Sequence, residues 1–231
     1  MFPLRDDNPT SRFPLLTVAL IAINAIVFGL EWLLPPEARE TFVQSYALIP
    51  AAVHEGKLDG WLGLFTSQFL HGGIFHLGGN MLYLWIFGNN IEDRLGRRRF
   101  LPFYLGCGAV AGLAQVAAAP ESTIPTIGAS GAVAGVLGAY ALLFPRARVY
   151  TLVILVIFLR VFPVPAGLWL GVWLLFQVGS ALFSGSQEGG GVAWFAHLGG
   201  FAVGFLLIKL VVPRKPKGID SMFGSHTWLE R

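Results

Sequence analysis

The sequence predicts an all-α, polytopic membrane protein. Of its 231 residues, 55% are hydrophobic and only 13% are charged, whereas about 25% of the residues of an ordinary soluble domain are charged. Apolar runs recur along the whole chain, and each approaches the length of about 20 residues that a helix needs to cross a bilayer. The six expected spans are Pro14–Leu34, Gly72–Ile91, Phe100–Ala119, Ile127–Phe144, Ala166–Phe183 and Val192–Val212.

The basic residues predict the orientation of these spans. If the N-terminus is cytoplasmic and all six segments cross, only Arg39 and Lys57 of the 16 lysines and arginines lie on the external side. Because positive charge concentrates in the cytoplasmic loops of membrane proteins, both termini are expected to be cytoplasmic. The same rule accounts for the sequence pI of about 9.2 without a nucleic-acid partner.

One apolar segment, Val149–Leu159, does not fit a span. It is bracketed by Arg148 and Arg160, and a helix of this length is too short to cross the bilayer. We therefore expect an interfacial hairpin or a half-buried strand on the cytoplasmic side. If the segment did cross, His197 would face the opposite side of the membrane from Ser130, and the charge distribution also argues against that arrangement.

Two reactive side chains lie in apolar stretches that are rich in small residues. Ser130 stands in Gly128-Ala129-Ser130-Gly131, and His197 stands in Ala196-His197-Leu198-Gly199-Gly200. Hydroxyl and imidazole groups are costly to place in hydrocarbon, so they persist there with polar partners or in a wetted cavity. Alone, such a serine usually bonds to its own helix backbone, and such a histidine to a neighbouring helix. A serine and a histidine that meet form a nucleophile and its base.

The expected topology brings these two groups to a common depth. The fourth and sixth spans both start on the external side, so Ser130 and His197 each lie about one turn below that surface, at a rise of about 1.5 Å per residue. The sixth span also carries Ala196, Gly200 and Gly204 at intervals of four residues, a pattern that lets helix backbones approach closely. We therefore expect these two spans to pack together and to bring Ser130 near His197.

The second span supplies further polar groups at the same depth. His76 and Asn80 are four residues apart, so they project from one helix face, and both can donate hydrogen bonds while neutral. They would form an oxyanion hole with a backbone N–H near Ser130, and Gly131 keeps that backbone accessible. His71 is five residues from His76, on a different face, and no cysteine or acidic residue is near, so we expect no metal site.

Four motifs occur in order along the chain. They are His71-x4-His76-x3-Asn80 and Gly88-x3-Glu92-x3-Gly96 in the second span, Gly128-x-Ser130-Gly131 in the fourth, and Ala196-His197-x2-Gly200-x3-Gly204 in the sixth. Together they resemble the motifs of the rhomboid intramembrane serine proteases, and the resemblance covers nearly the whole chain.

The resemblance implies a six-helix bundle with a membrane-associated first loop over residues 35–70. It also implies a catalytic dyad of Ser130 and His197 with no carboxylate as a third member. The implied oxyanion site consists of His76, Asn80 and the Ser130 N–H. The implied substrates are transmembrane segments of other proteins, which reach the site laterally between the second and fifth spans. No metal or soluble cofactor is implied.

The sequence departs from the family pattern at two positions. Many relatives carry a Trp-Arg pair in the first loop, whereas this chain has Trp61-Leu62-Gly63, so the anchoring role of that arginine is not carried over. Some relatives place a tyrosine four residues after the serine, stacked on the histidine, and here that position is Ala134. The resemblance therefore does not say what orients His197. We expect His71 to support the loop or the cavity wall, and Glu92 to make a structural contact at the cytoplasmic end of its helix.

Two other function classes compete with a protease. A non-catalytic relative that binds membrane clients normally lacks the serine or the histidine, and this chain has both. A small transporter needs polar residues that continue into the cytoplasmic half, where Leu137–Phe144 and Val203–Ile208 are nearly all apolar or small. The sequence therefore favours an intramembrane serine endopeptidase.

The expected organisation is one six-span catalytic domain over residues 1–213, followed by a basic cytoplasmic tail over residues 214–231. The expected partners are the lipid bilayer and transmembrane protein substrates, and the sequence does not define the oligomeric state. Short loops and the lack of an organelle-targeting stretch favour a bacterial inner membrane, with the active site open to the external side.

Overall fold

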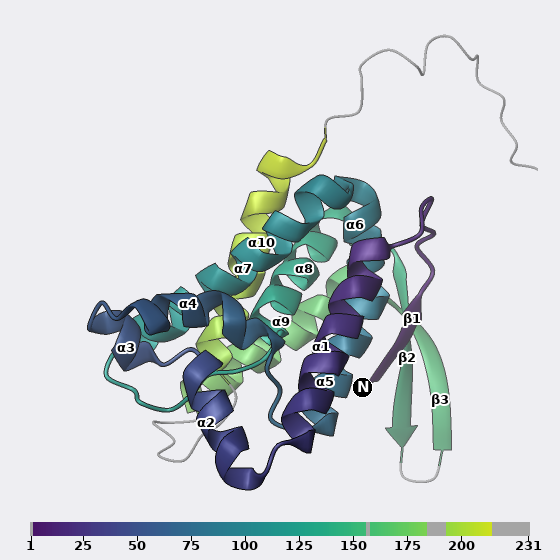
Figure 1. Cartoon of the computed structure of the whole chain (residues 1–231). Helices are drawn as coiled ribbons and strands as arrows, with labels where there is room; N and C mark the ends of the chain where they lie inside the picture. The colour runs from purple at the N-terminus through teal and green to yellow at the C-terminus, as the bar shows by residue number, and fades with distance from the viewer. Residues whose placement is uncertain (1, 156–157, 184–192, 214–231) are drawn as a thin grey trace, which may run out of the picture.

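The computed structural model describes residues 2–155, 158–183 and 193–213, and the expected basic tail at 214–231 lies outside these residues. Within them, a bundle of long helices carries a small β-sheet on one side (Figure 1). Three shorter elements follow one another directly and form a further long stretch: α5 (Ile74–Tyr83), η2 (Leu84–Gly88) and α6 (Asn89–Leu95). The long helices are α1 (Leu15–Leu33), α7 (Arg97–Ala118), α8 (Ser130–Leu143), α9 (Ala166–Phe183) and α10 (Trp194–Val211).

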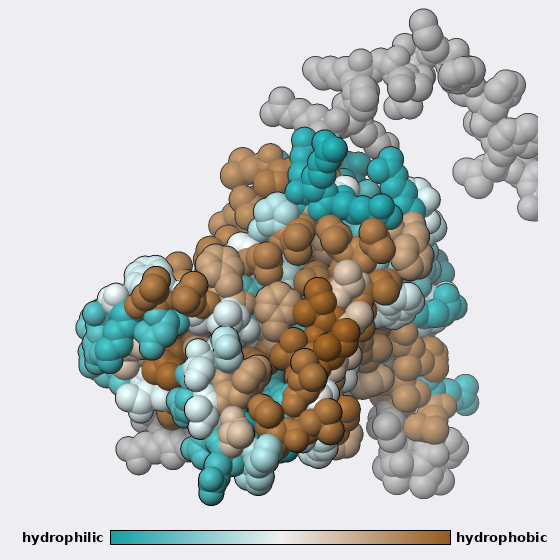
Figure 2. Space-filling model, viewed as in Figure 1, coloured by the Kyte–Doolittle hydropathy of each residue, from teal (hydrophilic) through white to brown (hydrophobic). Residues whose placement is uncertain are grey.

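Four of these helices, α1, α7, α9 and α10, are long and apolar enough to cross a membrane. The prediction of a polytopic helical membrane protein is thereby confirmed, while the count of six spans stays a prediction. The second expected span is interrupted by the π-helical turn η2, and the fourth is the 14-residue helix α8. On the face shown in Figure 2, apolar side chains cover much of the middle, and hydrophilic ones gather at the top and towards the lower left.

A three-stranded antiparallel sheet corrects the expectation of an all-α fold. Its strands are β1 (Phe2–Asp6), β2 (Arg148–Leu155) and β3 (Phe158–Pro165), in the order β1-β2-β3. The expected hairpin is confirmed, although its second strand runs on to Pro165, and strand β1 was not predicted. Strand β2 is rich in β-branched and aromatic residues, which favour strands. Proline disrupts a helix interior but is tolerated in an edge strand, and β3 is at the edge.

Helices α8 and α10 pack backbone to backbone through glycine. A Cβ atom at Gly204 would overlap the Gly135 carbonyl, and one at Gly200 would overlap the Gly131 carbonyl. The close packing that the small residues of the fourth and sixth spans predict is therefore confirmed. This contact runs along the part of each helix that carries the reactive side chains.

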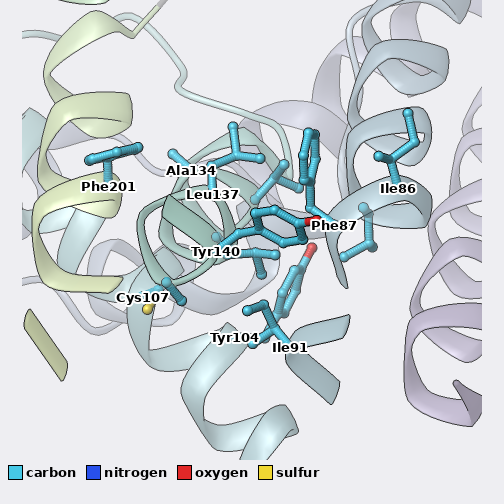
Figure 3. Close-up of a cluster of buried hydrophobic side chains, with 14 of the residues drawn as sticks. Ile86, Phe87, Ile91, Tyr104, Cys107, Ala134, Leu137, Tyr140 and Phe201 are labelled. Carbon is cyan, nitrogen blue, oxygen red and sulfur yellow. The ribbon is translucent and has the colours of Figure 1, made fainter. Parts of the chain in front are cut away.

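Buried aromatic side chains join α8 to η2 and α7 further along the bundle. Phe87 of η2 and Tyr140 of α8 meet edge to face, with ring centroids 4.9 Å apart. Figure 3 shows this pair beside Tyr104 of α7. Because the side chains of Phe87, Tyr104 and Tyr140 have no measurable exposure, they form a closely packed region that fixes the positions of three helices.

The first loop folds into short helices outside the bundle (Figure 1). Arg39 donates hydrogen bonds to the carbonyls of Glu31, Trp32 and Leu34. They lie at the C-terminal end of α1, where carbonyls need partners from outside the regular helix. The first loop thus contains an arginine, Arg39, although Trp61 is followed by Leu62 and not by arginine. The loop elements are α2 (Pro36–Tyr46), α3 (Pro50–His54), α4 (Leu58–Thr66) and η1 (Ser67–Phe69).

The first loop is also joined to the segment that leads into α8. Leu48 and Thr126 exchange two backbone hydrogen bonds, of 3.0 and 2.8 Å. The Gly128 N–H donates to the Ser67 carbonyl at 2.9 Å. The loop therefore fixes the backbone just before Ser130.

Candidate active site

Ser130 begins helix α8, after a turn that requires glycine. Gly128 has a φ of 126°, a conformation that residues with a side chain rarely adopt. The turn places Ser130 at the first position of the helix, where backbone N–H groups have no partner within the helix. The N–H groups of Ser130 and Gly131 are therefore donors at the positive end of the helix dipole, which favours negative charge.

His197 lies in the first turn of α10, directly across from the start of α8. A Cβ atom at Gly131 would stand 3.9 Å from the Ala196 carbonyl oxygen. Because Gly131 follows Ser130 and Ala196 precedes His197, the two reactive residues occupy matching positions on facing helices. Both side chains line the same cavity.

His76 projects from α5 onto the turn before Ser130. Its Nδ1 accepts a long hydrogen bond of 3.4 Å from the Gly72 N–H, so in the neutral ring the proton is on Nε2. A Cβ atom at Gly128 would stand 2.8 Å from Cε1 and Nε2 of His76, and 3.6 Å from Oγ of Ser130. The N–H of the His76 ring and the Ser130 hydroxyl thus face the same small volume beside Gly128.

Asn80 lies one turn further along α5 and is 8% exposed. Its Nδ2 has no hydrogen-bond partner among the described residues. Asn80, His76, Ser130 and His197 all line one cavity of about 1030 Å³. A buried amide donor without a protein partner is available to a ligand. The structure thus brings together the four residues that the sequence predicted to carry chemistry, from three different helices.

His71 and Glu92, the two other polar residues expected in support, lie outside the cavity lining. The His71 ring is 1% exposed and packs against the His76 ring, with centroids 5.1 Å apart. Glu92 is in α6, where its carboxylate accepts hydrogen bonds from the start of α1. His71 therefore supports the placement of His76, and Glu92 joins two helices away from the site.

Gln177 of α9 is a site residue that was not predicted from the sequence. Its side chain lines the cavity, and its Oε1 lies 2.7 Å from Nδ1 of His197. One turn earlier on α9, the centroid of the Trp173 ring lies 6.2 Å from the centroid of the His197 ring. A polar residue in the middle of an apolar span is a functional candidate by default, and that signal would have identified Gln177.

The chemistry of the cavity suits a negatively charged oxygen. Its described lining offers hydroxyl, imidazole, amide and backbone N–H groups and contains no carboxylate and no thiol. Across the part of the chain that the structure describes, no three His, Cys, Asp or Glu residues are grouped to hold a metal ion. Preorganised donors of this kind stabilise the oxyanion that forms in acyl transfer.

The comparison with known families agrees with this geometry. The family model of the Rhomboid domain matches residues 58–214, a stretch that contains the cavity residues of α5, α8 and α10. The chain belongs to the rhomboid family. Four helices of the described residues are long and apolar enough to cross a membrane, and this rhomboid is an integral membrane protein.

Relatives of this rhomboid come from mitochondria and from bacteria. Rhomboid protein 1, mitochondrial, of Saccharomyces cerevisiae is 38% identical over 200 residues, which are 83% of this chain and 51% of the relative. The human Presenilin-associated rhomboid-like protein, mitochondrial, is 31% identical over 150 residues, 64% of this chain and 36% of the relative. Rhomboid protease GluP of Bacillus subtilis is 35% identical over 127 residues, 54% of this chain and 24% of the relative. This rhomboid therefore spans about half the length of the yeast relative and less of the other two.

Proposed function

We propose that this rhomboid is an intramembrane serine endopeptidase that cleaves transmembrane segments of other proteins, with Ser130 as nucleophile and His197 as base. The observation that carries the proposal is the single cavity shared by Ser130, His197, His76 and Asn80. A structural serine or histidine needs one hydrogen-bond partner, whereas catalysis needs all of these groups around one volume. The family, which includes a member named as a protease, adds support.

In the proposed reaction, His197 accepts the proton of the Ser130 hydroxyl while Oγ attacks the scissile carbonyl carbon. The protonated His197 then gives this proton to the leaving amine, and an acyl-enzyme on Ser130 remains. Water enters the cavity from the external side, loses a proton to His197 and attacks the acyl carbon. The bond from this carbon to Oγ of Ser130 then breaks, and Oγ takes the proton back from His197. The proposed reaction uses no carboxylate as a third catalytic group, and the described lining of the cavity contains no carboxylate.

The negative charge that forms on the carbonyl oxygen needs donors that are already in place. The proposed donors are Nε2–H of His76, Nδ2–H of Asn80 and the backbone N–H of Ser130. His76 is held as a donor by the Gly72 N–H on its other ring nitrogen. The Ser130 N–H contributes because it stands at the start of α8, where it has no helical partner.

The proposal includes six crossings of the membrane, with α5–η2–α6 as the second and α8 as the fourth. Both termini then lie on the cytoplasmic side and the cavity opens externally, as the basic residues predict. Substrate would reach the cavity between α5 and α9, which contribute Tyr83 and Trp173 to its lining. A bacterial inner membrane remains a prediction, and two of the three relatives named above are mitochondrial.

The test is cleavage of a single-span reporter protein by the purified chain in detergent. The wild type should release two fragments whose new termini, read by mass spectrometry, lie in or next to the reporter's transmembrane segment. Ser130→Ala should release none, while Ser45→Ala, at an exposed serine of α2, should cleave like the wild type. Cleavage by Ser130→Ala at the wild-type rate would refute the proposal. So would a folded wild type that cleaves none of several reporters, and that result would favour a protein that only binds membrane clients.

A further inference from the structure

Gln177 is the buried residue in the external half of α9. Among the described residues of this helix, the buried ones are Ala166, Trp169 and Leu170 near its start, and Gln177. Gln177 is 5% exposed, whereas its neighbours Phe176 and Val178 are 64% and 38% exposed. A polar side chain is thus buried where the adjacent apolar ones face outward. Burial of an amide is favourable only when its polar atoms find partners.

The partner of Gln177 is the proposed catalytic base. Its Oε1 lies 2.7 Å from Nδ1 of His197, a distance typical of a strong hydrogen bond. An amide oxygen can only accept, so Nδ1 must carry the proton, and the lone pair of the neutral ring is then on Nε2. This is the tautomer that a base needs if Nε2 faces Ser130. The Trp173 ring, one turn away on α9, stands 6.2 Å from the same imidazole.

Helix α8 offers His197 no comparable support. The residue one turn after Ser130 is Ala134, whose side chain is a methyl group that packs near Gly200. The hydrogen bond from His197 therefore goes to α9, a helix that is anchored in the core at its other end. If the outer part of α9 moves away from α10, this bond is the one that breaks.

We propose that Gln177 is a positioning residue that holds His197 in the Nδ1–H tautomer, and thereby favours the base-competent form of His197 while α9 is docked against α10. The inference rests on the proposed function, because it assigns a partner to the base of that reaction. It adds a coupling between the helix that borders the proposed substrate path and the proton acceptor. Displacement of α9 by an arriving segment would release His197, and return of α9 would restore it.

The test combines a spectroscopic readout with kinetics on three variants of the full chain in detergent. Gln177→Met keeps the length of the side chain but removes the acceptor, and Gln177→Glu keeps an acceptor. Val178→Met is the matched control on the exposed side of the same helix. The ¹⁵N shifts of the His197 ring, assigned by comparison with His197→Gln, report which nitrogen carries the proton.

We expect the wild type, Gln177→Glu and Val178→Met to show His197 protonated on Nδ1, and Gln177→Met to shift towards Nε2–H. The kcat of reporter cleavage should fall about tenfold in Gln177→Met, the effect of one net hydrogen bond, with KM nearly unchanged, and Gln177→Glu should recover most of it. An unchanged tautomer in Gln177→Met would overturn the inference, as would a wild type with His197 protonated on Nε2. Equal kcat values for Gln177→Met and the wild type would also overturn it. Because the ¹⁵N readout needs no cleavage, failure of the inference is distinguishable from failure of the proposed function.

Discussion

The carboxylate of Glu92 accepts hydrogen bonds from the backbone N–H and the hydroxyl of Thr17, at 2.7 and 2.8 Å. It also accepts one from the Leu16 N–H, at 3.0 Å. The side chain of one helix thus caps the N-terminus of another, where N–H groups lack partners and the dipole favours negative charge. This contact joins α1 to α6, which follows α5, the helix of His76 and Asn80, through the turn η2. Glu92 itself is not part of the cavity lining.

Glu92→Ala should therefore destabilise the protein without acting on the chemistry. Loss of a charged, buried cap leaves two backbone donors unpaired, which we expect to cost about 3 kcal/mol and to lower the thermal midpoint in detergent by about 5–10 °C. Glu92→Gln, which keeps one carbonyl acceptor, should lose less. An unchanged midpoint for Glu92→Ala would show that the cap contributes nothing.

Asn80→Ala should slow cleavage and leave the fold intact. Nδ2 of Asn80 has no hydrogen-bond partner among the described residues. Removing this atom therefore breaks no hydrogen bond that it makes there. Loss of one oxyanion donor costs about 10²–10³-fold in kcat, and we expect a loss of this size with an unchanged thermal midpoint. Asn80→Asp is a second check, because a carboxylate would repel the oxyanion. A wild-type kcat for Asn80→Ala would make Asn80 a structural residue only.

Gly128→Ala should disable the site by displacing His76. The added Cβ would lie 2.8 Å from the His76 ring, and the φ of 126° is strained for alanine. We expect at least about a tenfold slower reaction of Ser130 with a fluorophosphonate, since His76 or the turn before Ser130 must move. The matched control is Gly78→Ala on α5, where a Cβ meets no atom within 4 Å. Equal labelling of the two variants would contradict the close packing of His76 on Gly128.

The docking of strand β1 should depend on pH through Asp6. Oδ2 of Asp6 accepts a hydrogen bond of 2.5 Å from the Tyr140 hydroxyl, and burial raises the pKa of this carboxyl above its ordinary value of 3.8. The docked strand thus binds the proton more tightly than the released strand does. Docking is therefore strongest below the ordinary pKa and weakens as the pH rises through the raised one.

Hydrogen exchange of the β1 amides, corrected for intrinsic rates, measures this dependence. Protection should decrease between about pH 4 and pH 7 in the wild type. It should change less in Asp6→Asn, which keeps an acceptor but does not titrate in this range. If protection changed with pH by the same amount in the wild type and in Asp6→Asn, a group other than Asp6 would cause the pH dependence.

The sequence allowed prediction of those parts of the fold and site that follow from helix periodicity and charge. His76 and Asn80 share a face because they are four residues apart, and Gly200 and Gly204 mark a close helix contact for the same reason. The turn η2 was not predictable in this way, because a π-helical turn has the same apolar composition as an α-helix. Strand β1 was missed since five residues gain their structure from pairing with β2, which lies more than a hundred residues later.

Gln177 shows where prediction from the sequence stopped within the site. One glutamine in an apolar span indicates a polar contact but not its partner. The contact between Gln177 and His197 depends on how α9 is rotated about its axis and on where α9 lies along α10. Buried side chains of α9 such as Trp169 and Leu170 determine both. Such packing is a property of the folded molecule and has no periodic signal in the chain.

The most direct test of the central claim, that Ser130 and His197 act as nucleophile and base, is covalent labelling of the folded protein with a fluorophosphonate. Intact mass and peptide mapping of the wild type should show one adduct, on Ser130. His197→Ala, with an unchanged thermal midpoint, should show almost none over the same time. An adduct on another residue, or labelling of Ser130 in His197→Ala at the wild-type rate, would contradict the account.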